Sequence, residues 1–103
     1  MASNNQYQRE QCIKLIRIHN EQLIEFDTEA ARKRQLLSYR HFRRIESLDD
    51  TVSYLTKALI LRRQYVQIQR FKLRIQKERV ALLMKQATEL KELKSQLGIV
   101  RVF

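Results

Sequence analysis

Residues 51–97 read TVSYLTKALILRRQYVQIQRFKLRIQKERVALLMKQATELKELKSQL, a stretch that contains neither proline nor glycine. Those two residue types are the strongest local interruptions of regular secondary structure. Gln, Leu, Lys, Arg, Glu and Ala, which favour helix, supply most of the stretch. We therefore expect one long helix over residues 51–97.

Apolar residues follow this expected helix along two lines. The first line has spacings built from three- and four-residue steps, and the second recurs every seven residues. The first comprises Tyr54, Leu61, Tyr65, Ile68, Ile75, Leu82, Leu90 and Leu97. The second comprises Val52, Leu59, Val66, Leu73 and Val80. Because the two lines lie on different sides of a helix, we expect both to be protein interfaces with different packing partners.

The first half of the chain has the same character. Residues 5–46 lack proline and glycine, and Ile16, His19, Leu23 and Phe26 recur at helical spacing. We expect a first helix over residues 5–46.

A short joint is expected at residues 47–50. Ser47 and Asp50 have the spacing of a capping box, in which Glu or Gln is the preferred partner. A joint there would let the helices fold back as a hairpin, whereas an unbroken chain would form a continuous rod. Gly98 is placed to end the second helix and leaves residues 98–103 as a short tail.

The expected fold is therefore all-α, a single helical unit over residues 1–103 with two long helices. It is a helical hairpin or an extended coiled-coil-like rod. Because one hairpin leaves one apolar line unmatched, we expect it to pack in an oligomer or against a partner.

The net charge of +10 is concentrated in two segments. Residues 32–46 hold 6 Lys and Arg against 1 acid, and residues 62–79 hold 7 against 1. In a hairpin turning at 47–50, Arg40 to Arg44 would lie beside residues 53–58 and Arg32 to Arg34 beside residues 62–66, so that the two clusters partly merge. The candidate polyanion-binding residues are Arg40, Arg43, Arg44, Arg63, Arg70, Arg74 and Lys77, the last four of which form one ridge on a helix.

Catalytic, cofactor and metal sites are not expected. Asp49 and Asp50 are adjacent and do not face each other on a helix. His19 and His41 have no second ligand at metal-site spacing. Cys12 is expected to be a small buried residue. We predict no enzymatic activity, no cofactor, no metal ion and no small-molecule substrate.

The sequence favours a location inside the cell, cytoplasmic (including cytoskeletal) or nuclear. The N-terminus is polar, and the longest apolar runs, 58–61 and 80–84, fall far short of the about 20 residues that span a bilayer. A single cysteine forms no internal disulfide, as is usual in a reducing compartment. We expect neither secretion nor a transmembrane segment, and the sequence does not favour a membrane as the partner.

Two functions are compatible with these features. The leading hypothesis is a non-enzymatic helical assembly or adaptor protein, which acts by coiled-coil-like packing with itself or with a protein partner. The alternative is sequence-independent binding of a duplex RNA or DNA backbone through clusters 32–46 and 62–79, with an affinity that falls steeply with salt. A third explanation of the charge is a solvated helix face.

Overall fold

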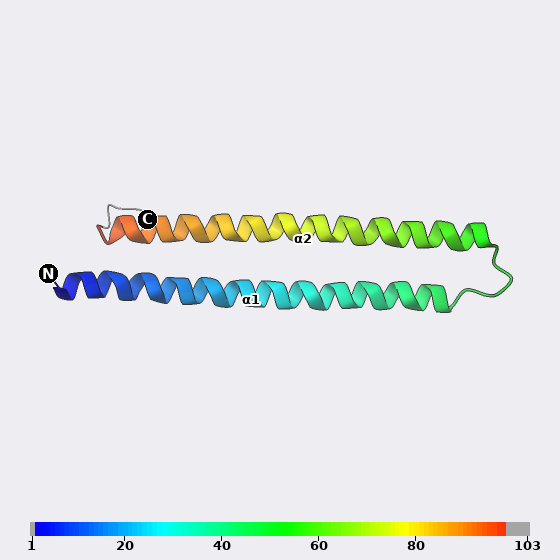
Figure 1. Ribbon diagram of the computed structural model, residues 1–103, viewed down its shortest axis with the longest axis horizontal. Helices are drawn as coiled ribbons and strands as arrows, with labels where there is room; N and C mark the ends of the chain where they lie inside the picture. The colour runs from blue at the N-terminus through cyan, green and yellow to red at the C-terminus, as the bar shows by residue number, and fades with distance from the viewer. Residues whose placement is uncertain (1, 99–103) are drawn as a thin grey trace. The chain divides into compact units, whose positions relative to one another are not determined.

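The protein forms two long helices, which confirms the predicted all-α fold. The structure is a computed structural model that describes residues 2–98, with helix α1 at Ala2–Glu46 and helix α2 at Tyr54–Gln96 (Figure 1). The described residues contain no strand.

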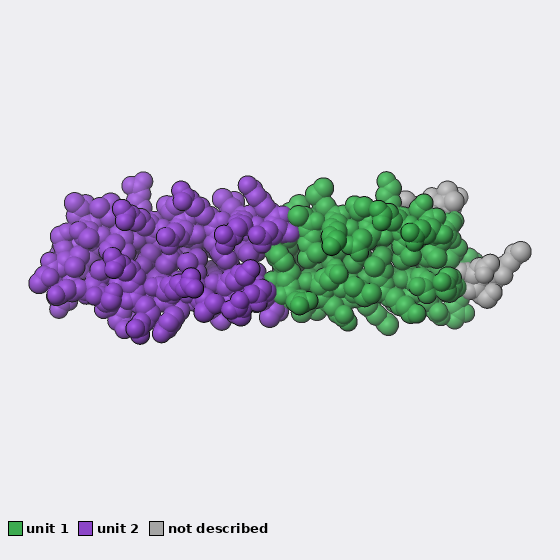
Figure 2. All heavy atoms as spheres, turned by 180° about the vertical axis from the view of Figure 1, so that it is seen from behind, with its two compact units in different colours: residues 1–26, 79–103 green, residues 27–78 purple. Residues whose placement is uncertain are grey.

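Contacts divide the chain into two compact units, coloured separately in Figure 2. Unit 1 comprises residues 1–26 and 79–103, and unit 2 comprises residues 27–78. Each unit therefore pairs a segment of α1 with a segment of α2. Grouping by contacts is not a test of cooperative folding, so the single helical unit expected over residues 1–103 stays a prediction.

In unit 1 the two helix segments run antiparallel (Figure 1). The side-chain amide of Gln8 donates to the carbonyl oxygen of Leu97 at 2.6 Å. Farther along, the amide of Gln86 donates to the carbonyl oxygen of His19 at 3.0 Å. The first turns of α1 therefore lie beside the last turns of α2.

Unit 2 is a helical hairpin, one of the two arrangements that the sequence left open. The side-chain amide of Gln64 donates to the carbonyl oxygen of His41 at 3.1 Å. The register expected from the sequence, with Arg40 to Arg44 beside residues 53–58, is wrong. The turn occupies residues 47–53, and α2 begins only at Tyr54, so the residues opposite α1 lie farther along the chain.

Ser53, not Ser47, caps the second helix. The backbone N–H of Thr56 donates to Oγ of Ser53 at 3.2 Å, as at a helix N-cap. The Oγ of Ser47 instead donates to the carbonyl oxygen of Arg44 at 2.9 Å, at the end of α1. Asp49 accepts from the backbone N–H of Thr51 at 3.3 Å, which orders the turn between the two helices.

Gly98 ends α2 as predicted. Its φ of 74° lies in the left-handed region, which glycine adopts without steric cost. Its N–H donates to the carbonyl oxygen of Ser95 at 3.1 Å and so satisfies one of the last carbonyls of the helix. The rest of the expected tail, residues 99–103, lies outside the described residues.

Buried and half-buried side chains recur along both helices in steps of four, three and four, an eleven-residue repeat. On α1 these positions are 8, 12, 15, 19, 23, 26, 30, 37, 41 and 45. On α2 they are 57, 60, 64, 68, 71, 75, 79, 82, 86, 90 and 93, and Leu97 follows directly after the helix. Eleven residues in three turns is close to the 3.6 residues per turn of an α-helix. Within a unit, each helix segment therefore keeps one side toward its neighbour.

Candidate interaction surfaces

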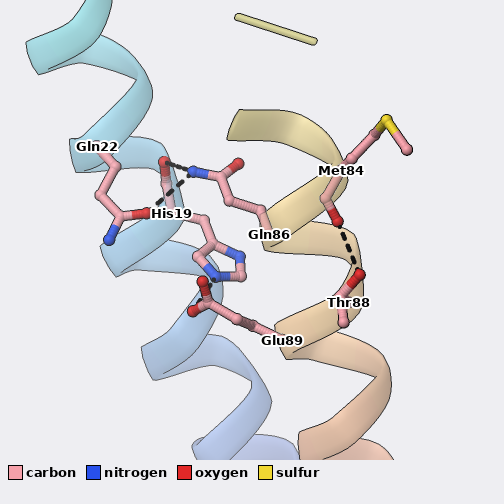
Figure 3. A network of polar contacts seen from close by, with 6 residues as sticks. All are labelled: His19, Gln22, Met84, Gln86, Thr88 and Glu89. Carbon is pink, nitrogen blue, oxygen red and sulfur yellow. Dashed lines mark hydrogen bonds and ion pairs between the residues drawn. The ribbon is translucent and has the colours of Figure 1, made fainter. Parts of the chain in front are cut away.

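A buried polar layer joins the two helix segments of unit 1 (Figure 3). His19 and Gln86 are each only 6% exposed. Besides its bond to the carbonyl oxygen of His19, the amide of Gln86 donates to Oε1 of Gln22 at 3.1 Å. Nε2 of His19 lies 3.4 Å from the carboxylate of Glu89. A shift of one residue between the helices would break these contacts, so the layer specifies the register.

Unit 2 contains an equivalent layer, displaced by 22 residues along each helix. The equivalent residues are His41 for His19, Gln64 for Gln86 and Gln67 for Glu89. Nε2 of His41 carries a hydrogen, because it lies 2.8 Å from Oε1 of Gln67, which accepts. Nδ1 of His41 is buried and has no hydrogen-bond partner in the part of the chain that the structure describes.

The role of the two glutamines does not follow from the apolar pattern of the sequence, because glutamine is polar. Both histidines appear in the sequence as candidates, but only for a metal site. The signal that could have found the layers is the shared separation, since the two histidines and the two glutamines are each 22 residues apart.

The first predicted apolar line divides into a half-buried part and an exposed part. Ile68, Ile75, Leu82, Leu90 and Leu97 are half-buried inside their own units. Tyr54, Leu61 and Tyr65 are exposed, Tyr54 by 90%. Near the start of α2 the half-buried positions are instead Lys57, Ile60 and Gln64. The predicted line leaves the inner side there because its seven-residue spacing drifts around the helix relative to the eleven-residue repeat.

The second predicted line lies on the opposite side of α2 from these inner residues. Leu59 and Val80 are 49% exposed and Leu73 is 58% exposed, while Val66 is half-buried. Val52 is half-buried within the turn. We call Leu59, Val66, Leu73 and Val80 the outer face of α2. Its role as a protein interface stays a prediction.

Unit 2 also holds an open groove of about 730 Å³ between α1 and α2. Its cations are Lys33 and Arg40 from α1 and Arg70 and Arg74 from α2, and no carboxylate lines it. Unit 2 has 13 Lys and Arg against 6 Asp and Glu, so it carries +7 of the net charge of +10. The hairpin thus brings the two basic clusters together. We call these four residues and their surroundings the basic groove.

Phe71 lines the groove and is 9% exposed, the apolar side chain that unit 2 buries most deeply. The guanidinium carbon of Arg74 lies 5.6 Å from the centre of the Phe71 ring, a cation–π contact that orients the arginine. Within residues 27–78, no carboxylate lies within ion-pair distance of Arg40, Arg70 or Arg74. Three of the four cations are therefore available to an external anion.

Arg32 is engaged differently. It donates to both carboxylate oxygens of Glu29, at 3.0 Å from Nε and 2.5 Å from the terminal nitrogen. This hydrogen bond is the main reason that the pKa of Glu29 lies below its ordinary value; desolvation opposes it, and the charges of Arg32 and Lys33 add to it. The pair is exposed and both of its residues belong to α1, so it does not hold α1 against α2 at the basic groove.

The other predicted polyanion-binding residues lie outside the basic groove. Arg43 and Arg44 occupy the last turn of α1, where the helix dipole favours cations. Arg63 lines an adjoining depression of about 380 Å³ on α2, which shares Gln67 and Arg70 with the basic groove, and Lys77 is exposed. Lys33 is not among the predicted site residues, because the predicted ridge lies on one helix and the place of Lys33 depends on the register between the two helices.

Few other features suggest chemistry. The described residues hold no group of three or more His, Cys, Asp or Glu side chains that could bind a metal ion. Cys12 is a free thiol and half-buried, less deeply than expected. Neither α1 nor α2, as described, combines the length and apolar character needed to cross a membrane. Comparison with protein-family models, with curated proteins and with solved structures finds no match to this chain.

Proposed function

We propose that the protein is a non-enzymatic helical assembly protein, which packs the outer face of α2 against a second copy of itself or a partner helix. The observation that supports this proposal most strongly is the exposure of Leu73, Leu59 and Val80 in one column. The inner side of α2 is already occupied by α1 in each unit. An apolar column at seven-residue spacing is typical of a coiled-coil seam.

Other exposed apolar side chains support the same proposal. Leu55 is 71% exposed, and Ile24 and Met84 are each 67% exposed. Covering such surface contributes about 25 cal/mol for each Å² removed from water.

The expected packing is a bundle of several helices. The companions of the outer face at the other heptad position include Arg62, Gln69 and Gln76, whereas a simple two-stranded coiled coil has apolar residues at both positions. A dimer of hairpins, in which each α2 contacts α1 on one side and the second copy on the other, meets this requirement.

The test is the solution mass of a variant in which the outer face carries a charge. Leu73→Asp is expected to reduce the mass measured by light scattering to that of the monomer, because a buried carboxylate without a partner is costly. The matched control, Lys72→Gln, lowers the net charge by the same one unit at an exposed position of α2 away from the outer face and is expected to assemble. Circular dichroism checks that both variants stay helical. An assembled, helical Leu73→Asp protein would show that the outer face is not the seam.

A second candidate function is sequence-independent binding of a nucleic-acid backbone. The observation that favours it is the basic groove, which gathers Lys33, Arg40, Arg70 and Arg74 on two facing helices. A mobility-shift titration at two salt concentrations tests it. Affinity should fall steeply as salt rises, because phosphate contacts release counterions. No shift at low salt would rule this function out.

For the compartment we propose the cytoplasm, including the cytoskeleton, or the nucleus. The support is the lone Cys12, which forms no disulfide within the chain.

A further inference from the structure

We infer that the basic groove of unit 2 binds a ligand with at least two adjacent phosphate groups, held between α1 and α2. The inference rests on the second candidate function and assigns it a site. The site differs from the ridge predicted on one helix, because its four cations come from both helices. Lys33 and Arg40 belong to α1, and Arg70 and Arg74 belong to α2.

The spacing of the cations matches several phosphates in a row. Arg70 and Arg74 lie one helical turn apart on α2, and Lys33 and Arg40 lie two turns apart on α1, a rise of roughly 10 Å. A flexible single strand or a linear polyphosphate can place at least two adjacent phosphates along this length. A single phosphate would meet only part of the set.

Because cations lie on both walls of the groove, α1 and α2, we expect a single nucleic-acid strand to bind better than a duplex. A single chain of phosphates that follows the groove is contacted from α1 and from α2 at once. A duplex presents only one of its two backbones to the same groove. Arginine, which supplies three of the four cations, donates in a planar fork that binds phosphate with two hydrogen bonds.

The groove offers no surface on which a base could stack. The Phe71 ring is 9% exposed with the Arg74 guanidinium over it, and the His41 ring is half-buried and hydrogen-bonded to Gln67. Proteins that hold single strands by their bases present accessible aromatic faces. The contacts are therefore with phosphate, and a free linear polyphosphate satisfies the same chemistry as a nucleic-acid strand.

Arg74 is oriented before any ligand binds. Its contact with Phe71 restricts the guanidinium, and no carboxylate of residues 27–78 forms an ion pair with it. A phosphate consequently displaces no internal partner from Arg40, Arg70 or Arg74. Binding loses less side-chain entropy at a restricted arginine than at a mobile one.

The test measures binding of a fluorescent oligo(dT) strand to the full chain at low salt, with competition by tripolyphosphate and by orthophosphate. Two pairs of double variants have matched charge. On α2, Arg70→Gln with Arg74→Gln is compared with Arg63→Gln and Lys77→Gln. On α1, Lys33→Gln with Arg40→Gln is compared with Arg34→Gln and Arg43→Gln. The α1 pair keeps the test decisive if removal of Arg74 disturbs the packing on Phe71.

The groove variants are expected to lose about tenfold or more in affinity, and the control variants about twofold or less, because only the former lose charged hydrogen bonds. Tripolyphosphate should compete and orthophosphate should not. Equal losses of affinity in the groove and control variants would show that the basic groove is not the binding site, whereas nucleic-acid binding itself would stand. Binding of tripolyphosphate without oligo(dT) would support the groove and end the nucleic-acid function. No binding of either would overturn both.

Discussion

Gln86 donates its side-chain amide to the backbone carbonyl oxygen of His19 at 3.0 Å, and Gln64 makes the same contact with His41 at 3.1 Å. Each unit is therefore held in register by one glutamine that reaches the backbone of the opposite helix. A pair of helices with few deeply buried apolar side chains needs such contacts, because apolar packing alone allows neighbouring registers.

Removing the amide of Gln86 should destabilise unit 1. Gln86→Ala is expected to lower the free energy of unfolding by about 2 kcal/mol, since it leaves a small cavity and removes two hydrogen bonds at a 6% exposed site. Urea denaturation followed by circular dichroism measures the change. Gln76→Ala, at an exposed position of the same helix, is the control and should change the free energy by less than about 0.5 kcal/mol. Equal effects would mean that the polar layer does not stabilise the unit.

The cap of α2 predicts that alanine substitutions of Ser53 and Ser47 differ in their effect on stability. Ser53→Ala should lower the free energy of unfolding by about 1 kcal/mol, because its Oγ accepts from the N–H of Thr56. Ser47→Ala should have a smaller effect, since its Oγ bonds to the end of α1 instead. Thermal unfolding of the two variants side by side makes the comparison. If Ser47→Ala lowered the free energy of unfolding more than Ser53→Ala, the second helix would be capped at Ser47, as the sequence predicted.

The positive φ of Gly98 predicts a cost for a β-carbon at that position. No atom lies within 4 Å of the place where the β-carbon would be, so the cost is conformational alone. Gly98→Ala should lower the free energy of unfolding by about 1 kcal/mol. Gly98→Asn should lose less, because asparagine tolerates the left-handed region. If both variants had the same free energy of unfolding as the unaltered protein, residue 98 would not adopt a positive φ at the end of α2.

The pKa of Glu29, and the stability that this residue contributes at acid pH, should depend on Arg32. The hydrogen bond from Arg32 is the main cause of the lowered pKa of Glu29. Stability from this pair is therefore present above the pKa of the unfolded chain and is lost as the pH falls through the lower pKa of the folded state. In an NMR titration, Arg32→Gln should raise the pKa of Glu29 toward 4.5, and Arg34→Gln should leave it unchanged. An unshifted pKa in Arg32→Gln would show that the pair does not form in solution.

Much of the fold followed from local signals in the sequence. The lack of proline and glycine before Gly98 predicts long helices, and the glycine itself marks the end of α2 because only the C-cap requires a positive φ. The pattern of Ile68, Ile75 and Leu82 predicts an inner side of α2, which the structure places within the units.

The register did not follow from the sequence, for a physical reason. It depends on the length of the turn, and two serines with similar local chemistry, Ser47 and Ser53, could each have ended it. The buried positions also include His19, Gln64 and Gln86, whose polarity hides them from a search for apolar residues. Without the register, the approach of Lys33 to the cations of α2 could not be foreseen.

The most direct test of the central claim is the solution mass of the unaltered protein by light scattering over a range of concentrations. The outer face of α2 predicts an assembled species of at least twice 12.5 kDa at high micromolar concentration, which dissociates on dilution. A mass of 12.5 kDa at every concentration would contradict self-assembly through the outer face.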